Sequence, residues 1–145
     1  IKLAKKEGAT ILTGGNKILF SGRLKDGYFM EPTVIEGLDK SCRTNQEEIF
    51  GPIVTLIPFS SEPEAINIAN ATDYGLAASI WSEDLDKASR IAGEIDFGIV
   101  WLNCWMVRDL RTPFGGTKNS GLGREGGDAG LEFFTEPKNI CMAEV

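Results

Sequence analysis

The fold is decided by residues 53–102, which read IVTLIPFSSEPEAINIANATDYGLAASIWSEDLDKASRIAGEIDFGIVWL. Residues 53–59 form a continuous run of apolar and β-branched side chains, a pattern typical of a buried strand. Ser61 and Glu64 follow with the spacing of a capping box, and Pro63 occupies the first turn of the predicted helix. A strand is therefore expected to lead directly into a helix.

The same alternation continues along this stretch. The helix is expected to end near Asn70, and Ala77–Trp81 then predicts a second strand. Ser82 is positioned to cap a second helix with apolar residues at three- and four-residue spacing, before a third strand at Phe97–Leu102. Strands that alternate with helices imply a parallel sheet with right-handed crossovers.

The sequences on either side of residues 53–102 have different apolar patterns and more glycine. Ile1–Glu7 is typical of the last turns of a helix, ended by Gly8, and we expect a further segment to precede it. Short apolar runs between glycines in Ala9–Leu38 predict short strands and turns. Seven of the 17 glycines lie in Gly115–Gly130, which predicts an ordered loop, and the apolar run Ile140–Ala143 predicts one more strand.

Composition excludes several classes of function. A length of 145 residues with 42% hydrophobic residues is typical of a globular domain. The net charge of −6 opposes broad binding to nucleic acid, and neither a membrane span nor a signal peptide is evident, so we expect a cytoplasmic protein. The chain has no histidine, which excludes a Ser-His or Cys-His pair from within it, and its three cysteines lack the spacing of a metal site.

Gly121, Gly123 and Gly126 match the spacing of a dinucleotide-binding loop. No predicted strand leads directly into Gly121, although such a loop normally follows one. This context favours a loop that packs closely against other backbone over a loop that binds phosphate.

Adjacent carboxylates at Glu47 and Glu48 precede the first strand of the regular unit, followed by Phe50, Gly51 and Pro52. Two neighbouring acids are often a solvated surface pair. The residues alone therefore favour a solvated pair over a ligand site.

Arg108, Asp109 and Arg111 follow the strand that ends near Leu102. Loops beyond the carboxyl ends of parallel strands are where ligands bind in open sheets. Two guanidinium groups there could clamp carboxylates through charge-assisted hydrogen bonds. The alternative is an internal pairing of Asp109 with one of the two arginines.

Several blocks of sequence occur in the order and spacing of the aldehyde dehydrogenases, which the chain resembles over its whole length. These blocks are Glu47–Pro52, Tyr74–Ala78, Pro113–Gly116 with Lys118, Ser120-Gly121, and Gly123-Arg124-Glu125. Further blocks are similar to the 2-hydroxymuconate and 2-aminomuconate semialdehyde dehydrogenase branch, namely Trp105, Arg108–Thr112 and Phe134–Asn139.

The resemblance implies an α/β fold, with residues 1–135 as the carboxy-terminal part of a three-layer αβα catalytic domain with a mostly parallel sheet. Residues 136–145 would be an oligomerisation strand that pairs with another subunit. The family oxidises an aldehyde through a cysteine thiohemiacetal, with hydride transfer to NAD and a glutamate base. Because the nucleotide domain, nucleophile and base all belong upstream of Ile1, we expect no catalytic residue in this segment, no metal, and no activity of the segment alone.

Roles for individual residues follow from the same resemblance. Glu48 would hydrogen-bond the nicotinamide ribose, and Phe50 would pack beside the nicotinamide. Arg108, Arg111 and Phe114 would line the tunnel for a carboxylated semialdehyde. The alternative is a catalytically inactive short module that pairs with full-length subunits.

Overall fold

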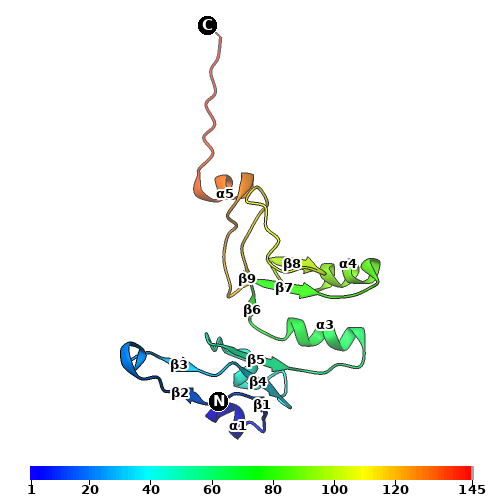
Figure 1. The fold of residues 1–145 in the computed structure, drawn as a ribbon. Coiled ribbons are helices and arrows are strands. Elements are labelled where there is room, and N and C mark those ends of the chain that lie inside the picture. Colours follow the sequence, from blue (N-terminus) through cyan, green and yellow to red (C-terminus); the bar gives the residue numbers. More distant parts are fainter. Residues whose placement is uncertain (145) are drawn as a thin grey trace. The chain divides into compact units, whose positions relative to one another are not determined.

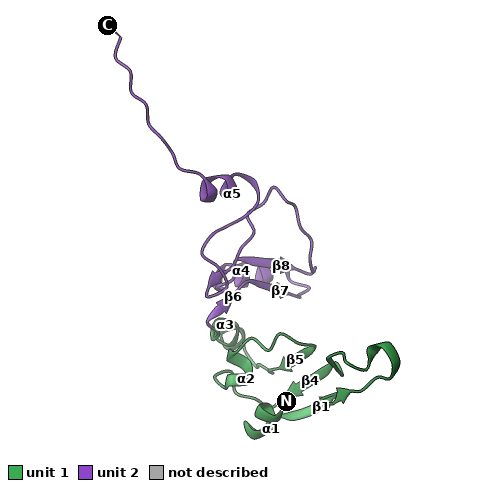
Figure 2. Cartoon of the chain, turned by 90° about the vertical axis from the view of Figure 1, so that its left-hand side faces the viewer, with its two compact units in different colours: residues 1–72 green, residues 73–145 purple. Residues whose placement is uncertain are grey.

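The computed structural model describes residues 1–144 of the chain. They divide into two compact units, residues 1–72 and the residues from Asp73 onward (Figure 2). Each unit mixes helices with strands, which confirms the α/β class predicted from the sequence. Within the described residues, no helix has the length and apolar content needed to cross a membrane.

The first unit is built on a three-stranded sheet (Figure 1). Strand β4 (Thr33–Glu36) is central, with β1 (Thr10–Thr13) antiparallel on one side and β5 (Ile53–Leu56) parallel on the other. The other elements of this unit are α1 (Lys2–Lys6), β2 (Lys17–Ile18), the 3-10 helix η1 (Gly22–Leu24), β3 (Phe29–Met30), α2 (Arg43–Gln46) and α3 (Glu62–Asn70).

The core of the first unit joins helix α1 to the central strand. Ile35 of β4 is fully buried and clusters with Ala4 of α1 and with Leu38. Ile11 and Ile53, from the two flanking strands, pack against this cluster. Burial of such aliphatic side chains contributes about 1.5–3 kcal/mol each, so these contacts fix the start of β5 and the segment that leads into it.

The cap of α3 confirms the prediction from its sequence. The Ser61 hydroxyl accepts a hydrogen bond from the Glu64 amide at 3.4 Å. The Glu64 carboxylate in turn accepts from the Ser60 amide at 2.8 Å. Both kinds of hydrogen bond of a capping box are therefore present. The Glu64 carboxylate binds the amide of Ser60, one residue before the cap residue Ser61.

The second unit contains a parallel strand pair joined by a helix. Strand β7 (Ala77–Ile80) leads to α4 (Leu85–Glu94), which returns to β8 (Ile99–Leu102) in parallel register with β7. Ala88 of α4 and Trp101 of β8 are buried. The remaining elements are β6 (Tyr74–Gly75), antiparallel to β9 (Thr117–Lys118), and the helix α5 (Gly127–Phe134).

Two local predictions were wrong. The cap of α4 is Asp84 and not Ser82, because the Asp84 carboxylate reaches the Lys87 amide at 2.9 Å, whereas the Ser82 hydroxyl accepts from Asp84 itself at 3.1 Å. The glycine-rich loop also ends earlier than predicted. Gly126 turns the chain with φ of 85°, and α5 begins at the next residue.

The strand pairing does not confirm the single mostly parallel sheet expected from the sequence. The described strands form four sheets, of which β4 with β5 and β7 with β8 contain the parallel pairs. The three-layer arrangement stays a prediction.

Residues 135–144 form neither helix nor strand and are drawn as an extended trace (Figure 1). The intersubunit strand at 136–145 therefore also stays a prediction. Val145 lies outside the described residues.

A close backbone approach fixes the glycine-rich loop beside β8. A Cβ atom on Gly98 would overlap the carbonyl oxygen of Gly115. Gly98→Ala should therefore lower the free energy of unfolding by about 1–3 kcal/mol, since backbone must move to admit the methyl group. Urea unfolding of the purified protein measures this change.

Gly93→Ala is the matched control, because no atom lies within 4 Å of a Cβ there and Gly93 belongs to the exposed side of α4. It should be neutral or raise stability by up to about 1 kcal/mol. Equal stability of the two variants would contradict the close approach.

Candidate functional site

The segment before β5 is held by the carboxylate of Glu7, the C-cap residue of helix α1. Glu7 accepts hydrogen bonds from the Arg43 amide at 3.0 Å, the Thr44 amide at 3.2 Å and the Thr44 hydroxyl at 2.5 Å. These bonds satisfy donors at the first turn of α2 that have no partner within the helix. The Thr44 hydroxyl lowers the pKa of Glu7 most, with the two amides adding to the effect. Sequence reasoning missed this contact, which joins residues 36 and 37 positions apart.

The structure separates the roles of the two adjacent acids. Glu47 accepts two hydrogen bonds from the Arg43 guanidinium, at 2.5 and 3.0 Å, and this partner lowers the pKa of Glu47. Glu48 is exposed and makes no hydrogen bond or ion pair with the described residues. The two acids help to line a pocket of about 120 Å³ with Ile35 and Ile53. Glu48 is therefore the carboxylate that remains available to a ligand.

Phe50 has two unusual features together. Its backbone has φ of 52°, a left-handed conformation that costs a non-glycine residue about 1–3 kcal/mol. Its side chain is 92% exposed, so burial of the ring does not offset this cost in the described chain. Backbone strain of this kind concentrates at ligand-binding sites, which supports a functional role for the ring.

The loop after β8 is anchored before it reaches its charged residues. The Ser79 hydroxyl donates to the Cys104 carbonyl at 2.7 Å, and the Trp101 indole donates to the Val107 carbonyl at 2.7 Å. The Asn103 side chain exchanges two hydrogen bonds with the backbone of Ser82, at 2.7 and 2.8 Å. The sequence did not single out these polar groups, which fix the loop up to the residue before Arg108.

Arg108 is held by two partners within the same unit. Its Nη2 atom donates to Glu125 Oε1 at 3.0 Å, and the guanidinium carbon lies 4.1 Å from the centre of the Phe114 ring. This second contact is a cation–π interaction, which is typically worth about 0.5–1 kcal/mol at exposed sites. The structure thus brings together Arg108 and Phe114, two of the predicted substrate residues, and adds Glu125.

Arg111 has a local partner instead. Its guanidinium binds both carboxylate oxygens of Asp109, with distances of 2.5 to 3.1 Å, which is one of the internal pairings left open by the sequence. This pairing lowers the pKa of Asp109 and raises that of Arg111. The Arg111 side chain is 89% exposed. A direct role for Arg111 in substrate binding stays a prediction.

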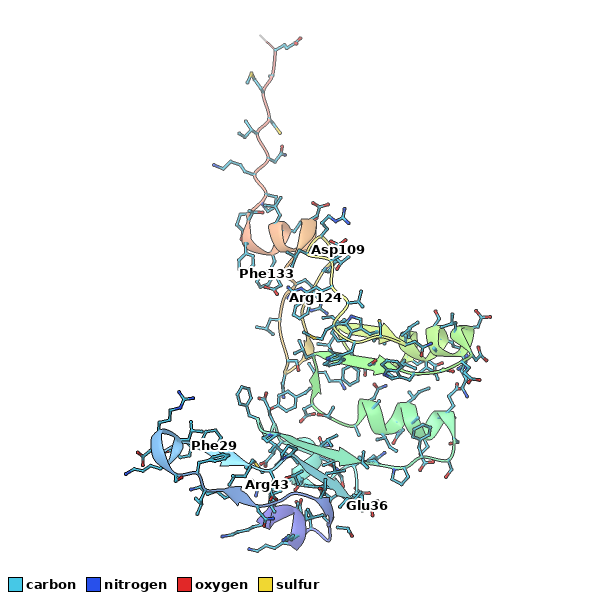
Figure 3. The ribbon with its side chains drawn as sticks, viewed as in Figure 1. Phe29, Glu36, Arg43, Asp109, Arg124 and Phe133 are labelled. Atoms are coloured by element: carbon cyan, nitrogen blue, oxygen red, sulfur yellow. The ribbon has the colours of Figure 1, made fainter. Side chains whose placement is uncertain are left out.

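The glycine-rich loop packs against protein backbone, as its sequence context favoured. Phe114 and Glu125 exchange two backbone hydrogen bonds, at 2.7 and 2.8 Å, which close the loop at its base. The Arg124 guanidinium donates to the carbonyls of Gly116 and Gly123 at 2.7 and 3.0 Å. Figure 3 labels Arg124 in this loop and Phe133 in the neighbouring helix α5.

An open pocket of about 490 Å³ lies along this loop. Its lining is mostly apolar, and its members are Leu76, Phe114, Gly115, Gly116, Ser120, Gly121, Leu122, Gly123, Arg124, Glu125, Phe133 and Phe134. Apolar walls with a few polar groups are typical of small-molecule sites. Within residues 1–144, no cluster of three or more Cys, Asp and Glu side chains could hold a metal ion.

Comparison with known proteins identifies close relatives. The model of the aldehyde dehydrogenase family matches residues 1–140. The chain is 51% identical over 139 residues to the 2-hydroxymuconic semialdehyde dehydrogenase of Pseudomonas putida, covering 96% of this chain and 29% of that protein. It is 48% identical over 145 residues to the human 2-aminomuconic semialdehyde dehydrogenase, covering 98% of this chain and 30% of that protein.

Solved structures agree with this likeness. Betaine aldehyde dehydrogenase from Staphylococcus aureus in complex with NAD⁺ matches with a TM-score of 0.82 and 48% identity, covering 92% of this chain and 26% of that one. The aldehyde dehydrogenase of Mycobacterium tuberculosis complexed with NAD⁺ matches with a TM-score of 0.83 and 42% identity, over 93% and 27% of the two chains. The present chain thus spans less than a third of the length of these proteins.

The contact between Glu7 and α2 predicts a local dependence on pH. Because the folded state lowers the pKa of Glu7 below its ordinary 4.5, the stabilisation is present above that value and is lost as the pH falls through the folded pKa. An NMR titration should show the Glu7 carboxyl and the Thr44 amide changing together, with a midpoint below 4.5.

Thr44→Val is the matched control, because it removes the hydroxyl that lowers the pKa most. It should move the Glu7 midpoint upward, toward the ordinary value. A midpoint at or above 4.5 in the unmodified protein would contradict the contact.

Proposed function

The chain belongs to the aldehyde dehydrogenase family, and from this we propose that it is the carboxy-terminal segment of an NAD-dependent dehydrogenase that oxidises a carboxylated semialdehyde. The observation that carries the substrate class is the placement of Arg108 on an anchored loop, above the ring of Phe114. Relatives at 50–51% identity that act on muconic semialdehydes, by their names, support the same class.

In the second unit, Arg108 would bind the carboxylate of the substrate. A guanidinium carries several N–H donors, and Glu125 accepts from a single nitrogen of Arg108. A carboxylate can therefore bind the remaining donors in a charge-assisted contact. Arg111 would support Arg108 less directly, because its guanidinium is already paired with Asp109. Phe114 would contribute an apolar wall as well as the ring beneath Arg108.

In the first unit, the segment before β5 would bind the cofactor. Glu48 fits the two neighbouring hydroxyls of a ribose, because its carboxylate is exposed and makes no bond with the described residues. Phe50 presents an uncovered ring that can pack against a flat heterocycle. NAD, when bound, accepts the hydride removed from the substrate. The work of this chain is to orient the nicotinamide, while the nucleophile and base are supplied from outside the segment, which alone would be inactive.

The remaining residues would complete a larger assembly. We infer that residues 1–135 form part of a three-layer αβα catalytic domain with a mostly parallel sheet. Residues 136–145 would form a strand that pairs with another subunit of a homo-oligomer. The exposed apolar side chains of Ile140 and Met142 support this pairing. Pairing with another subunit would remove them from water, and unpaired apolar edges favour association.

The role of Glu48 predicts a specific kinetic defect. In the full-length enzyme that contains this sequence, Glu48→Gln should slow hydride transfer about tenfold or more, because small misplacement of reacting groups is costly. Single-turnover formation of NADH measures this step. Glu47→Gln is the matched control: it weakens an exposed pair with Arg43 and should change the rate less than about twofold. An unchanged rate of hydride transfer in Glu48→Gln would mean that Glu48 is a solvated surface acid without a role at the cofactor.

The role of Arg108 predicts a change in substrate preference. Arg108→Ala should lower kcat/KM for 2-hydroxymuconate semialdehyde roughly thirty- to a thousandfold, a loss of about 2–4 kcal/mol in transition-state stabilisation. It should affect an uncharged aldehyde of similar size much less. Arg111→Ala, which removes a guanidinium already paired with Asp109, should have a smaller effect. Steady-state kinetics with both aldehydes measure the difference. Equal losses for the two aldehydes would mean that Arg108 shapes the loop without binding the carboxylate.

A further inference from the structure

We propose that Glu125 is a positioning residue for Arg108, and that it sets the preference of the enzyme for carboxylated over uncharged aldehydes. The inference rests on the proposed function, in which Arg108 meets the substrate carboxylate. It adds a residue in the glycine-rich loop, 17 positions along the chain, that acts on the substrate through Arg108.

Backbone geometry fixes Glu125 beside Phe114. The Phe114 amide donates to the Glu125 carbonyl at 2.7 Å, and the Glu125 amide donates to the Phe114 carbonyl at 2.8 Å. These bonds do not involve either side chain, so they survive substitution of the Glu125 carboxylate. These two backbone hydrogen bonds therefore fix the Phe114 ring and the Glu125 carboxylate, which both contact Arg108, on adjacent backbone segments.

The two contacts hold Arg108 in complementary ways. Phe114 faces the guanidinium at 4.1 Å from the ring centre, and Glu125 accepts at its edge at 3.0 Å. A long arginine side chain has many rotamers, and an arginine that is already ordered loses less rotamer entropy when the substrate binds. Exposed ion pairs by themselves contribute little to stability, so the expected effect of Glu125 is on substrate affinity and not on folding.

The pairing leaves most of the guanidinium available. Glu125 engages Nη2 of Arg108, and the other two nitrogens have no acceptor among residues 1–144. The neighbouring Arg124 has a different kind of partner, because its Nη1 atom donates to the backbone carbonyls of Gly116 and Gly123. Arg124 thus stabilises the loop, whereas Arg108 is oriented and still has donors for an anion.

Steady-state kinetics of the full-length enzyme test the inference with 2-hydroxymuconate semialdehyde and an uncharged aldehyde of similar length. Glu125→Ala should lower kcat/KM for the carboxylated substrate about tenfold, mainly through a higher KM, and less than about threefold for the uncharged one. Glu125→Gln should recover most of the loss, because its amide oxygen can accept the same hydrogen bond. Glu132→Gln removes an equivalent exposed carboxylate on α5 and should have no selective effect.

A double variant separates this inference from the proposed function. If Glu125 acts through Arg108, Glu125→Ala should cause no further loss in an Arg108→Ala background. An equal loss for both substrates, a glutamine variant as impaired as the alanine variant, or the same loss in both backgrounds would overturn the positioning role. Failure of Arg108→Ala to discriminate between the substrates would instead overturn the proposed function.

Discussion

The pair of backbone hydrogen bonds between Phe114 and Glu125 is the contact on which the candidate substrate site depends. It closes a loop with little regular structure. The carbonyl oxygen of Gly115 in this loop occupies the position that a Cβ atom on Gly98 would take. Because the loop is fixed at this point, Phe114 and Glu125 can hold Arg108 from two directions. A glycine-rich sequence here provides rigidity through close packing, although glycine is often associated with flexibility.

The sequence predicted the elements whose formation depends on neighbouring residues. The strand at β5, the Ser61 cap of α3 and the order of β7, α4 and β8 follow from apolar periodicity and local capping. The split between Glu47 and Glu48 could also have been predicted, because Arg43 lies four residues before Glu47 on a short helix. The role of Glu48 as the available acid then follows by difference.

Most of the features that the sequence did not reveal depend on residues far apart in the chain. The Arg108–Glu125 pair and the capping of α2 by Glu7 join positions that no local pattern connects. The start of α5 was missed because Gly127 lowers helix propensity, yet the apolar residues that follow favour a helix. The sheet to which a strand belongs likewise depends on which strands it pairs with. The alternation of strands and helices along the sequence limits these pairings but does not determine them.

A crystal structure of the full-length enzyme with NAD and a carboxylated, unreactive aldehyde analogue tests most directly whether this segment selects the substrate. The distance to measure joins the analogue carboxylate to the Arg108 guanidinium. If Arg108 recognises the carboxylate, two of its N–H groups should lie at about 2.7–3.2 Å from the carboxylate oxygens, with Glu125 still bound to Arg108. A carboxylate bound by other residues, with Arg108 facing away from it, would contradict the assignment.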